Sequence, residues 1–339
     1  MISKPDVAAL INLIDRFAGT PLVVVGDLIV DHYVWGKVDR ISPEAPVVVV
    51  NVTEENRRLG GAGNVARNLV TLGAAVTVCG VVGDDYAGRA LISMIDELGA
   101  NSSSVLVDRS RTTTVKTRVI AHSQQVVRVD REVISPLAET YGHALAAAVQ
   151  STFESTKGII VSDYAKGTIG PQLFDRFGEG VQKGLLGLGK VPVLVDPKAP
   201  HFELYRNASI IKPNRREAEQ AAGTSIRDRA SGVRAAQSLL NRWQCEMVLV
   251  TLGEHGMVLV GRDETEPPVE VETEAREVFD VSGAGDTVSA VFTLALAAGG
   301  TPAEAAYLSN VAAGIVVGEI GTVAVEAEEL RAALKRSRG

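Results

Sequence analysis

The 339-residue sequence contains few of the residues that mark metal-binding, disulfide-rich or membrane proteins. Its two cysteines, Cys79 and Cys245, lie in apolar strand-like contexts without a CxxC pair, which favours buried thiols in a reducing compartment. The five histidines show no zinc-ligand spacing, and no Ser/His/Asp or Cys/His set is evident. Because no apolar run reaches about 18 residues, we expect no membrane span.

The sequence also lacks an excess of basic charge, and its N-terminal stretch does not have the pattern expected of a secretion signal. The formal net charge is −7, so the chain has no basic surface of the kind that binds nucleic acid. Asp6 and Asp15 interrupt the apolar residues of the N-terminal stretch, which predicts an amphipathic helix and not a signal peptide. We therefore expect a cytoplasmic protein with neither nucleic acid nor membrane as a partner.

What the sequence does contain is an alternation of short β-branched runs and longer helical patterns. Hydrophobic residues make up 46% of the chain and charged residues 22%, as in a typical globular protein. The runs predict strands at 21–27, 74–84, 158–163, 191–196, 209–214 and 246–253, with helices near 62–72, 86–98, 283–299 and 301–318. This order predicts an α/β fold with a mostly parallel sheet, whose carboxyl edge carries polar residues and binds the ligand.

Two segments depart from this alternation. Residues 33–55 and 111–132 alternate apolar and polar residues, as strands of a half-exposed sheet do. Neither segment has a helical pattern, and ordinary βα units separate them. We expect them to form a small β lid over the carboxyl edge of the main sheet, within a single domain that covers residues 1–339.

The stretch DVSGAGD at 280–286 places three small residues directly before an acidic residue at the start of an apolar helix. The N–H groups of Gly283, Ala284 and Gly285 would lie at the positive end of the helix dipole, where anions bind. Asp286 would add a carboxylate beside that anion site. Phosphoryl transfer needs this combination of positioning, charge stabilisation and a base. The alternative is a glycine-rich turn into a buried helix.

A second glycine cluster includes Gly60, Gly61 and Asn64. Residues 61–66 match GxGxxA, and Asp84 follows at the end of a predicted strand, so a dinucleotide fingerprint is one interpretation. However, the strand before the glycines belongs to the predicted lid. A glycine floor under a polyhydroxylated substrate therefore fits the pattern better.

Further acidic and amide side chains follow predicted strands. Asn214 and Glu217 fit a helix capping box, and they could equally hold a hydrated Mg²⁺ against nucleotide phosphates. Asp27 and Asp31 lie at the end of the first strand, where carboxylates could accept hydrogen bonds from vicinal hydroxyls. A turn or helix-cap role is the alternative for Asp27.

The two glycine motifs together resemble the two signatures of the ribokinase-like, or PfkB, sugar kinases. Within that family the chain is similar to the D-glycero-D-manno-heptose-7-phosphate kinases of ADP-heptose synthesis. The residues that carry this resemblance are GDLIVDHYVWGKVDRISPEAPVVVV, RRLGGAGNVARNL, KTRVIAHSQQVVRVDRE and SDYAKG. It implies a ribokinase-like three-layer sandwich and ATP-dependent phosphorylation of heptose 7-phosphate at its anomeric hydroxyl.

The resemblance also implies roles for individual residues. Asp286 would deprotonate the sugar, and the backbone N–H groups of Gly283, Ala284 and Gly285 would stabilise the transferring phosphoryl group. ATP and Mg²⁺ would be held by Asn214, Arg215, Arg216 and Glu217, with an adenine wall at Thr251, Gly253, Gly256, Asn310 and Gly314. The sugar would contact Asp27, Asp31, Gly60, Gly61 and Asn64.

Two further ionic sites and a partner are expected. The distal sugar phosphate needs cations, for which Lys116, Arg118, Arg128 and Lys166 are the candidates. The family's monovalent cation, K⁺, corresponds to Asp280, Ser282 and carbonyl groups near Val316 and Gly321, although Val281 replaces the usual threonine of that loop. A homodimer through the exposed lid edge is also expected.

Several alternatives remain open at this level. A related kinase could act on ribose, fructose 6-phosphate or a nucleoside, the fingerprint could serve a dehydrogenase, or the chain could be a nucleotide-binding regulator without turnover. The heptose kinases are often fused to a nucleotidyltransferase with an HxGH motif, which this sequence lacks. We therefore expect a stand-alone kinase or one half of a split or truncated protein.

Overall fold

The computed structural model describes residues 5–122, 124–263, 265–274, 281–319 and 323–336. Its centre is a nine-stranded sheet with the order β13-β12-β11-β10-β9-β8-β1-β4-β5. These strands are β1 (Pro21–Gly26), β4 (Ala75–Gly83), β5 (Asn101–Asp108), β8 (Ile159–Ser162), β9 (Val193–Asp196), β10 (Ile210–Ile211), β11 (Met247–Thr251), β12 (Met257–Gly261) and β13 (Val269–Val271).

The sheet is mostly parallel, as its continuous apolar strands predict. Every neighbouring pair from β5 across to β11 is parallel, whereas β12 and β13 add to β11 as antiparallel edge strands. Parallel strands have their carboxyl ends at one edge, and β1, β8, β9, β10 and β11 all end there. The polar residues that follow these strands are consequently brought side by side.

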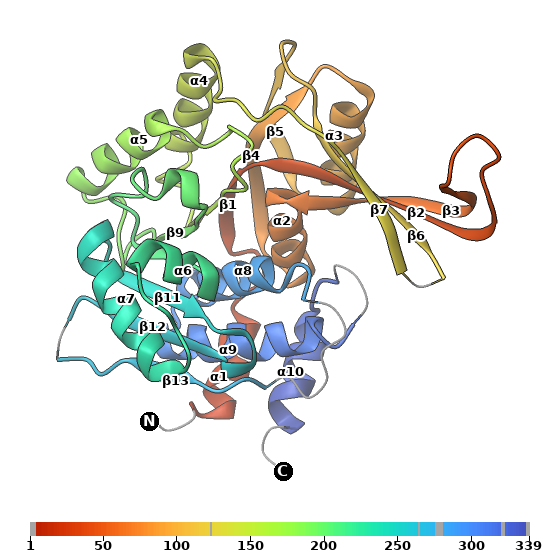
Figure 1. Ribbon diagram of the computed structural model, residues 1–339. Coiled ribbons are helices and arrows are strands. Elements are labelled where there is room, and N and C mark those ends of the chain that lie inside the picture. The colour runs from red at the N-terminus through yellow and green to blue at the C-terminus, as the bar shows by residue number, and fades with distance from the viewer. Residues whose placement is uncertain (1–4, 123, 264, 275–280, 320–322, 337–339) are drawn as a thin grey trace.

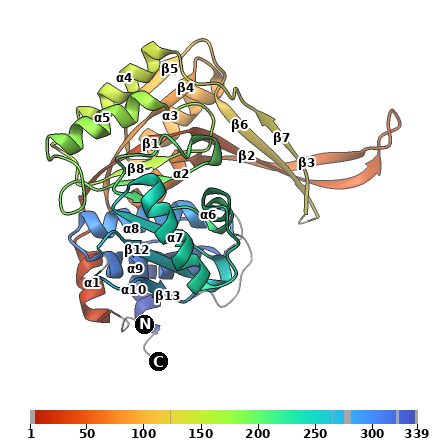
Figure 2. The same cartoon turned by 60° about the vertical axis from the view of Figure 1, so that its left-hand side comes forward.

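Helices cover both faces of the sheet (Figure 1). One apolar core lies between the sheet and α1 (Val7–Asp15), α2 (Ala62–Thr71), α3 (Tyr86–Leu98), α8 (Ala284–Ala297), α9 (Pro302–Val316) and α10 (Ala327–Arg336). The other core lies between the opposite face and α4 (Glu139–Gln150), α5 (Pro171–Gln182), α6 (Arg215–Ala222) and α7 (Arg229–Trp243). Figure 2 shows the resulting helix–sheet–helix layers from a second direction.

A four-stranded second sheet forms the expected lid and projects from the body (Figure 1). Its order is β3-β2-β6-β7, and only the β2–β6 pair is parallel. Its strands are β2 (Leu28–Ile41), β3 (Val48–Gly61), β6 (Thr114–Ala121) and β7 (Gln124–Arg131). The first two strands reach further into the body than the predicted segment 33–55, because β2 starts directly after β1 and β3 runs into α2.

The junction between β3 and α2 depends on Gly61. Its φ is +56°, and a Cβ atom at this position would lie 2.3 Å from the backbone oxygen of Asp27. Since β3 belongs to the lid and not to the central sheet, the strand–turn–helix unit of a dinucleotide fingerprint does not form here. Asp84 instead pairs with Arg89 and Arg109 at the surface. The dehydrogenase interpretation thus loses its structural basis.

We predict that Gly61→Ala destabilises the fold more than Gly99→Ala does. Both glycines have positive φ, which costs a non-glycine residue about 1–3 kcal/mol. Only Gly61 adds a collision with backbone, because nothing lies within 4 Å of a Cβ at Gly99. The check is the urea midpoint of both variants. Equal losses would show that the contact with Asp27 does not constrain the junction.

Candidate active site

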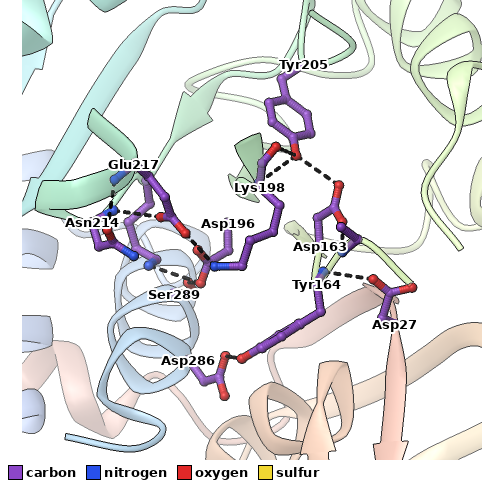
Figure 3. Close-up of polar contacts among 12 residues, drawn as sticks. Asp27, Asp163, Tyr164, Asp196, Lys198, Tyr205, Asn214, Glu217, Asp286 and Ser289 are labelled. Carbon is purple, nitrogen blue, oxygen red and sulfur yellow. Dashed lines mark hydrogen bonds and ion pairs between the residues drawn. The ribbon is translucent and has the colours of Figure 1, made fainter. Parts of the chain in front are cut away.

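Asp286 lies in the first turn of α8, at the carboxyl edge of the central sheet, and is 4% exposed. Its Oδ2 accepts a hydrogen bond from Asn64 Nδ2 at 2.7 Å. Its Oδ1 accepts one from the Tyr164 hydroxyl at 2.8 Å, as Figure 3 shows. Burial raises the pKa of Asp286 to about 6, with the charge of Asp196 adding to the effect and the two hydrogen bonds opposing it. At neutral pH the group is a carboxylate that is ready to take a proton.

The start of α8 presents backbone N–H groups beside this carboxylate. Gly283 is the N-cap residue with φ +84°, and its position has no side-chain cap. The N–H of Ala284 donates to the carbonyl of Val281 at 3.3 Å, while the N–H groups of the next residues begin the helix and have no intrahelical acceptor. The anion site expected at 283–285 stays a prediction, with the Ala284 N–H already bonded in this structure.

A buried ion pair lies beneath the same helix end. Lys212 Nζ is 3.0 Å from Asp196 Oδ2, and the lysine is only 2% exposed. Ser289 Oγ donates to the same carboxylate at 3.2 Å. A Cβ atom added to Gly285 would lie 3.6 Å from Lys212 Nζ and 3.9 Å from Asp196 Oδ2, so both charges of the pair lie close to the glycine loop.

The motif at 212–217 forms the capping box that the sequence allows. Asn214 Oδ1 accepts from the backbone N–H of Glu217, and Glu217 Oε2 accepts from the N–H of Asn214, both at 3.0 Å. The second oxygen of Glu217 pairs with Lys198 (Figure 3). The capping box and the ion pair thus supply bonding partners for the side chains of Asn214 and Glu217. A role of these two residues in binding Mg²⁺ stays a prediction.

Two adjoining cavities extend from the start of α8. The larger, of about 770 Å³, has predicted phosphate-side and catalytic residues in its wall: Asn214, Arg215, Arg216, Gly283, Ala284, Gly285 and Asp286. The second, of about 500 Å³, is bordered by all five predicted adenine-wall residues, Thr251, Gly253, Gly256, Asn310 and Gly314. Thr251, Gly253 and Gly285 border both cavities, so the structure brings the two predicted halves of a nucleotide site together.

The predicted sugar-side residues gather where the lid meets the body. Asp31 on β2 forms an ion pair with Arg118 on β6, and a Cβ atom at Gly60 would lie 2.4 Å from Asp31 Oδ2. Asn64 Oδ1 is buried and has no hydrogen-bond partner among the described residues. A buried amide oxygen without a donor is costly unless a ligand or water supplies one.

Three of the four predicted phosphate-binding cations are already paired. Arg118 pairs with Asp31, Lys166 lies 2.8 Å from Glu132 Oε2, and Arg128, on the exposed strand β7, pairs with Asp130. Lys116 on β6 has no ion pair within the described residues. Burial lowers its pKa, and the positive charges of Lys166 and Arg128 lower it further. A lysine in this position is stabilised by an incoming anion.

Asp27 differs from its expected surroundings. It is buried, and its carboxylate accepts hydrogen bonds from the backbone N–H groups of Tyr164, Lys166 and Thr168 at 2.8–3.1 Å. These bonds hold the segment after β8 against β1, which is the turn role that the sequence offered as the alternative. Contact between Asp27 and a sugar stays a prediction.

The predicted monovalent-cation site is only partly described. Asp280 and Gly321 lie outside the described residues, whereas Ser282 and Val316 lie within them. Within the described residues, no group of three or more His, Cys, Asp or Glu side chains is arranged to hold a metal ion. The Mg²⁺ site and the K⁺ site therefore remain predictions.

Four polar residues of the site were not predicted as such: Tyr164, Asp196, Lys198 and Lys212. Asp196 is the last residue of β9 and the other three come shortly after a strand of the central sheet, so the rule that ligands bind at the carboxyl edge could have identified them. What the sequence does not indicate is their pairing. Lys212 is paired with Asp196 and Tyr164 with Asp286, and the residues of each pair come from different strands or helices.

Comparison with known proteins gives a consistent assignment. A model of the pfkB family of carbohydrate kinases matches residues 20–329. The chain is 45% identical over 322 residues to the bifunctional protein HldE of Pelobacter propionicus, covering 94% of this chain and 64% of that protein. It is 46% identical over 308 residues to HldE of Geobacter metallireducens, covering 91% and 61% respectively. The chain thus spans less than two thirds of the length of these relatives.

Solved structures with low sequence identity share the fold. Ribokinase from Arabidopsis thaliana, complexed with ribose and ATP, matches with a TM-score of 0.72 and 20% identity over 94% of this chain and 99% of that chain. Phosphofructokinase-2 from Escherichia coli in complex with potassium matches with a TM-score of 0.75 and 17% identity over 95% and 100%. The predicted ribokinase-like fold is confirmed. None of the described helices is long and apolar enough to span a membrane.

We predict that Lys212→Met lowers the free energy of unfolding by about 3–5 kcal/mol, because it leaves the Asp196 carboxylate buried without its partner. Lys198→Met is the matched control. That lysine also pairs with a carboxylate, but its side chain is 36% exposed, so the loss should be about 1 kcal/mol or less. Urea denaturation compares the two variants. A Lys212→Met variant as stable as the control would contradict a buried charge pair.

Proposed function

This chain belongs to the pfkB family of carbohydrate kinases, and we propose that its substrate is D-glycero-D-manno-heptose 7-phosphate. It is an ATP-dependent sugar kinase, and the product we propose is heptose 1,7-bisphosphate, a precursor of ADP-heptose and of the lipopolysaccharide core. The single observation that supports the chemistry best is the buried Asp286 carboxylate beside the N-terminus of α8. The substrate rests on the similarity to HldE proteins together with the cations near the lid.

In the proposed reaction Asp286 accepts the proton of the anomeric hydroxyl as that oxygen attacks the γ-phosphorus of ATP. The new O–P bond forms, the bond to the β-phosphate oxygen breaks, and ADP leaves with the bonding electron pair. Charge that develops on the γ-phosphoryl oxygens is stabilised by the N–H groups of 283–285 and by the nearby Lys212 ammonium. The wild-type rate should fall as the pH drops through about 6, since the protonated carboxyl cannot act as the base.

The two cavities proposed to bind the nucleotide have groups suited to Mg²⁺ and to adenine. Asn214 borders the phosphate cavity and is joined to Glu217 by the capping box, and their side-chain oxygens are of the kind that Mg²⁺ prefers while keeping several waters. A bound Mg²⁺ would neutralise charge on the β- and γ-phosphates. The smaller cavity, with Asn310 and Gly314 in its wall, would hold the adenine ring. K⁺ would bind as a second cation.

The acceptor side favours a sugar that carries an anionic group. Asp31 and the orphan oxygen of Asn64 would accept hydrogen bonds from sugar hydroxyls over the Gly60–Gly61 floor. Lys116, with no ion pair among the described residues, would bind the distal phosphate together with Arg118, Arg128 and Lys166. A neutral sugar such as ribose would leave Lys116 without a counter-charge among the described residues.

A homodimer through the lid is part of the proposal. Strands β3 and β7 are the two edges of the lid sheet, and β7 is exposed along its whole length. Exposed apolar side chains on these strands include Val48, Val52, Val127 and Val129. Unpaired edges with apolar residues are suited to pairing with a second copy.

We predict that the wild-type enzyme consumes ATP with heptose 7-phosphate in preference to ribose, fructose 6-phosphate or adenosine. Asp286→Asn, which keeps the shape of the side chain, should reduce turnover about 10²–10⁴-fold because the base is lost. A coupled assay of ADP release measures the acceptor preference of the wild type and the turnover of the variant.

If only another acceptor is phosphorylated, the proposed substrate is wrong and the proposed mechanism still holds. A wild type inactive toward every sugar would instead favour a nucleotide-binding regulator.

The cation assignment gives a separate prediction. Lys116→Met should raise KM for heptose 7-phosphate about 10–100-fold, the value of a hydrogen bond to a charged group, with KM for ATP unchanged. Lys37→Met, which alters another lysine of the lid strands, is the control and should leave both constants unchanged. A Lys116→Met enzyme with normal KM for the sugar phosphate would place the distal phosphate elsewhere.

A further inference from the structure

The Tyr164 side chain contacts the proposed base directly, although the reaction as described does not use it. Its hydroxyl donates to Asp286 Oδ1 at 2.8 Å (Figure 3). Asn64 binds the other oxygen of the carboxylate. We propose that Tyr164 is a positioning residue that fixes the Asp286 carboxylate for proton abstraction and keeps it ionised near neutral pH. This inference rests on the proposed role of Asp286 as the base.

The backbone that carries Tyr164 is firmly held. Asp27 accepts the N–H groups on either side of the segment, at Tyr164 and Thr168, and also that of Lys166 between them. The segment closes through Gly167, which has φ +93° and where a Cβ atom would lie 1.8 Å from the backbone oxygen of Ser135. A buried carboxylate that accepts three backbone hydrogen bonds is hard to displace. The position from which the Tyr164 side chain extends is therefore fixed.

A second set of contacts fixes the preceding residue. The Asp163 carboxylate accepts hydrogen bonds from the backbone N–H of Ala165 at 2.7 Å and from the Tyr205 hydroxyl at 2.9 Å. His201 Nδ1 also lies 2.6 Å from it. Two buried aspartates, Asp27 and Asp163, thus hold the turn from which Tyr164 extends.

The ring of Tyr164 lies between the two halves of the site. Lys116 Nζ, from the lid, is 5.8 Å from the ring centroid, and Lys198 Nζ, from the nucleotide side, is 5.7 Å from it. Both distances allow cation–π attraction. Tyr164 also borders the larger cavity with Asp286. The ring therefore spans the region between the sugar-side cations and the phosphate side, with its hydroxyl on the base.

In the pair formed by Tyr164 and Asp286, the proton stays on the Tyr164 phenol. Burial and the charges of Asp286 and Asp196 raise the pKa of Tyr164 well above its ordinary value, so the phenol stays protonated and remains a donor. Donation to the charged form of Asp286 opposes the effect of burial and lowers that carboxyl's pKa. The carboxylate retains lone pairs for the sugar hydroxyl, and the phenol proton is not transferred.

Other groups also act on the titration of Asp286. Asn64 donates to it without titrating itself. The charged groups that face it are the carboxylate of Asp196, the ammonium of Lys212 and the guanidinium of Arg67. None of these is altered by removing the Tyr164 hydroxyl, so a change in the pKa of Asp286 after that substitution reports the lost hydrogen bond.

The test is Tyr164→Phe, which keeps the ring and deletes the hydroxyl. We expect the acid limb of kcat to move about one unit to higher pH, which by itself lowers kcat at neutral pH about twofold, with KM for ATP unchanged. Carbon-13 NMR of carboxyl-labelled aspartate, in the ligand-free enzyme, should show the same upward shift for the resonance that Asp286→Asn removes. This second readout needs no sugar substrate.

Tyr205→Phe is the matched control. It deletes another buried tyrosine hydroxyl of the same network, one that binds Asp163 and not Asp286. Its acid limb and its Asp286 resonance should titrate as in the wild type, even if its thermal stability falls. A Tyr164→Phe enzyme that loses stability with neither titration moved would overturn the inference. If no sugar is phosphorylated by the wild type, the substrate proposal fails, and the NMR titration still decides the role of Tyr164.

Discussion

The rest of the site depends on one buried carboxylate, that of Asp286, and on the two hydrogen bonds that hold it. Its donors come from segments far apart in the sequence, Asn64 in α2 and Tyr164 after β8. A buried carboxylate is stable only if it is well hydrogen-bonded, so the fold must bring these three segments to one point. The same burial raises the pKa of Asp286 to about 6, a value suited to a base that works near neutral pH.

This constraint explains why the lid and the body are built as one continuous unit. Strand β2 starts directly after β1, and β3 returns through Gly61 into α2, which carries Asn64 to the base. The carboxylate of Asp27, beside the same junction, fixes the turn that carries Tyr164. One continuous stretch of backbone therefore positions both the residues expected to bind the sugar and those that hold the base. A shift of the lid strands would change the surroundings of Asp286.

The sequence was sufficient for the architecture and for the residues that follow recognisable motifs. Continuous apolar runs predicted the parallel strands, and the glycine loop before Asp286 predicted a helix start with uncapped N–H groups, as the structure has it. It could not predict the partners of buried charges. The Lys212–Asp196 pair joins residues that follow two neighbouring strands, and strand order is not encoded locally. Asp27 was expected at a sugar, because nothing in its local sequence reveals three backbone donors from 164–168.

The most direct test of the account is the position of the phosphate that the enzyme adds. Wild-type enzyme would be given ATP, Mg²⁺ and heptose 7-phosphate, and the product followed by phosphorus-31 NMR with proton coupling. The account predicts a second sugar phosphate coupled to the anomeric proton, with ADP formed in equal amount. A new phosphate on any other carbon, or inorganic phosphate in place of a sugar bisphosphate, would contradict it.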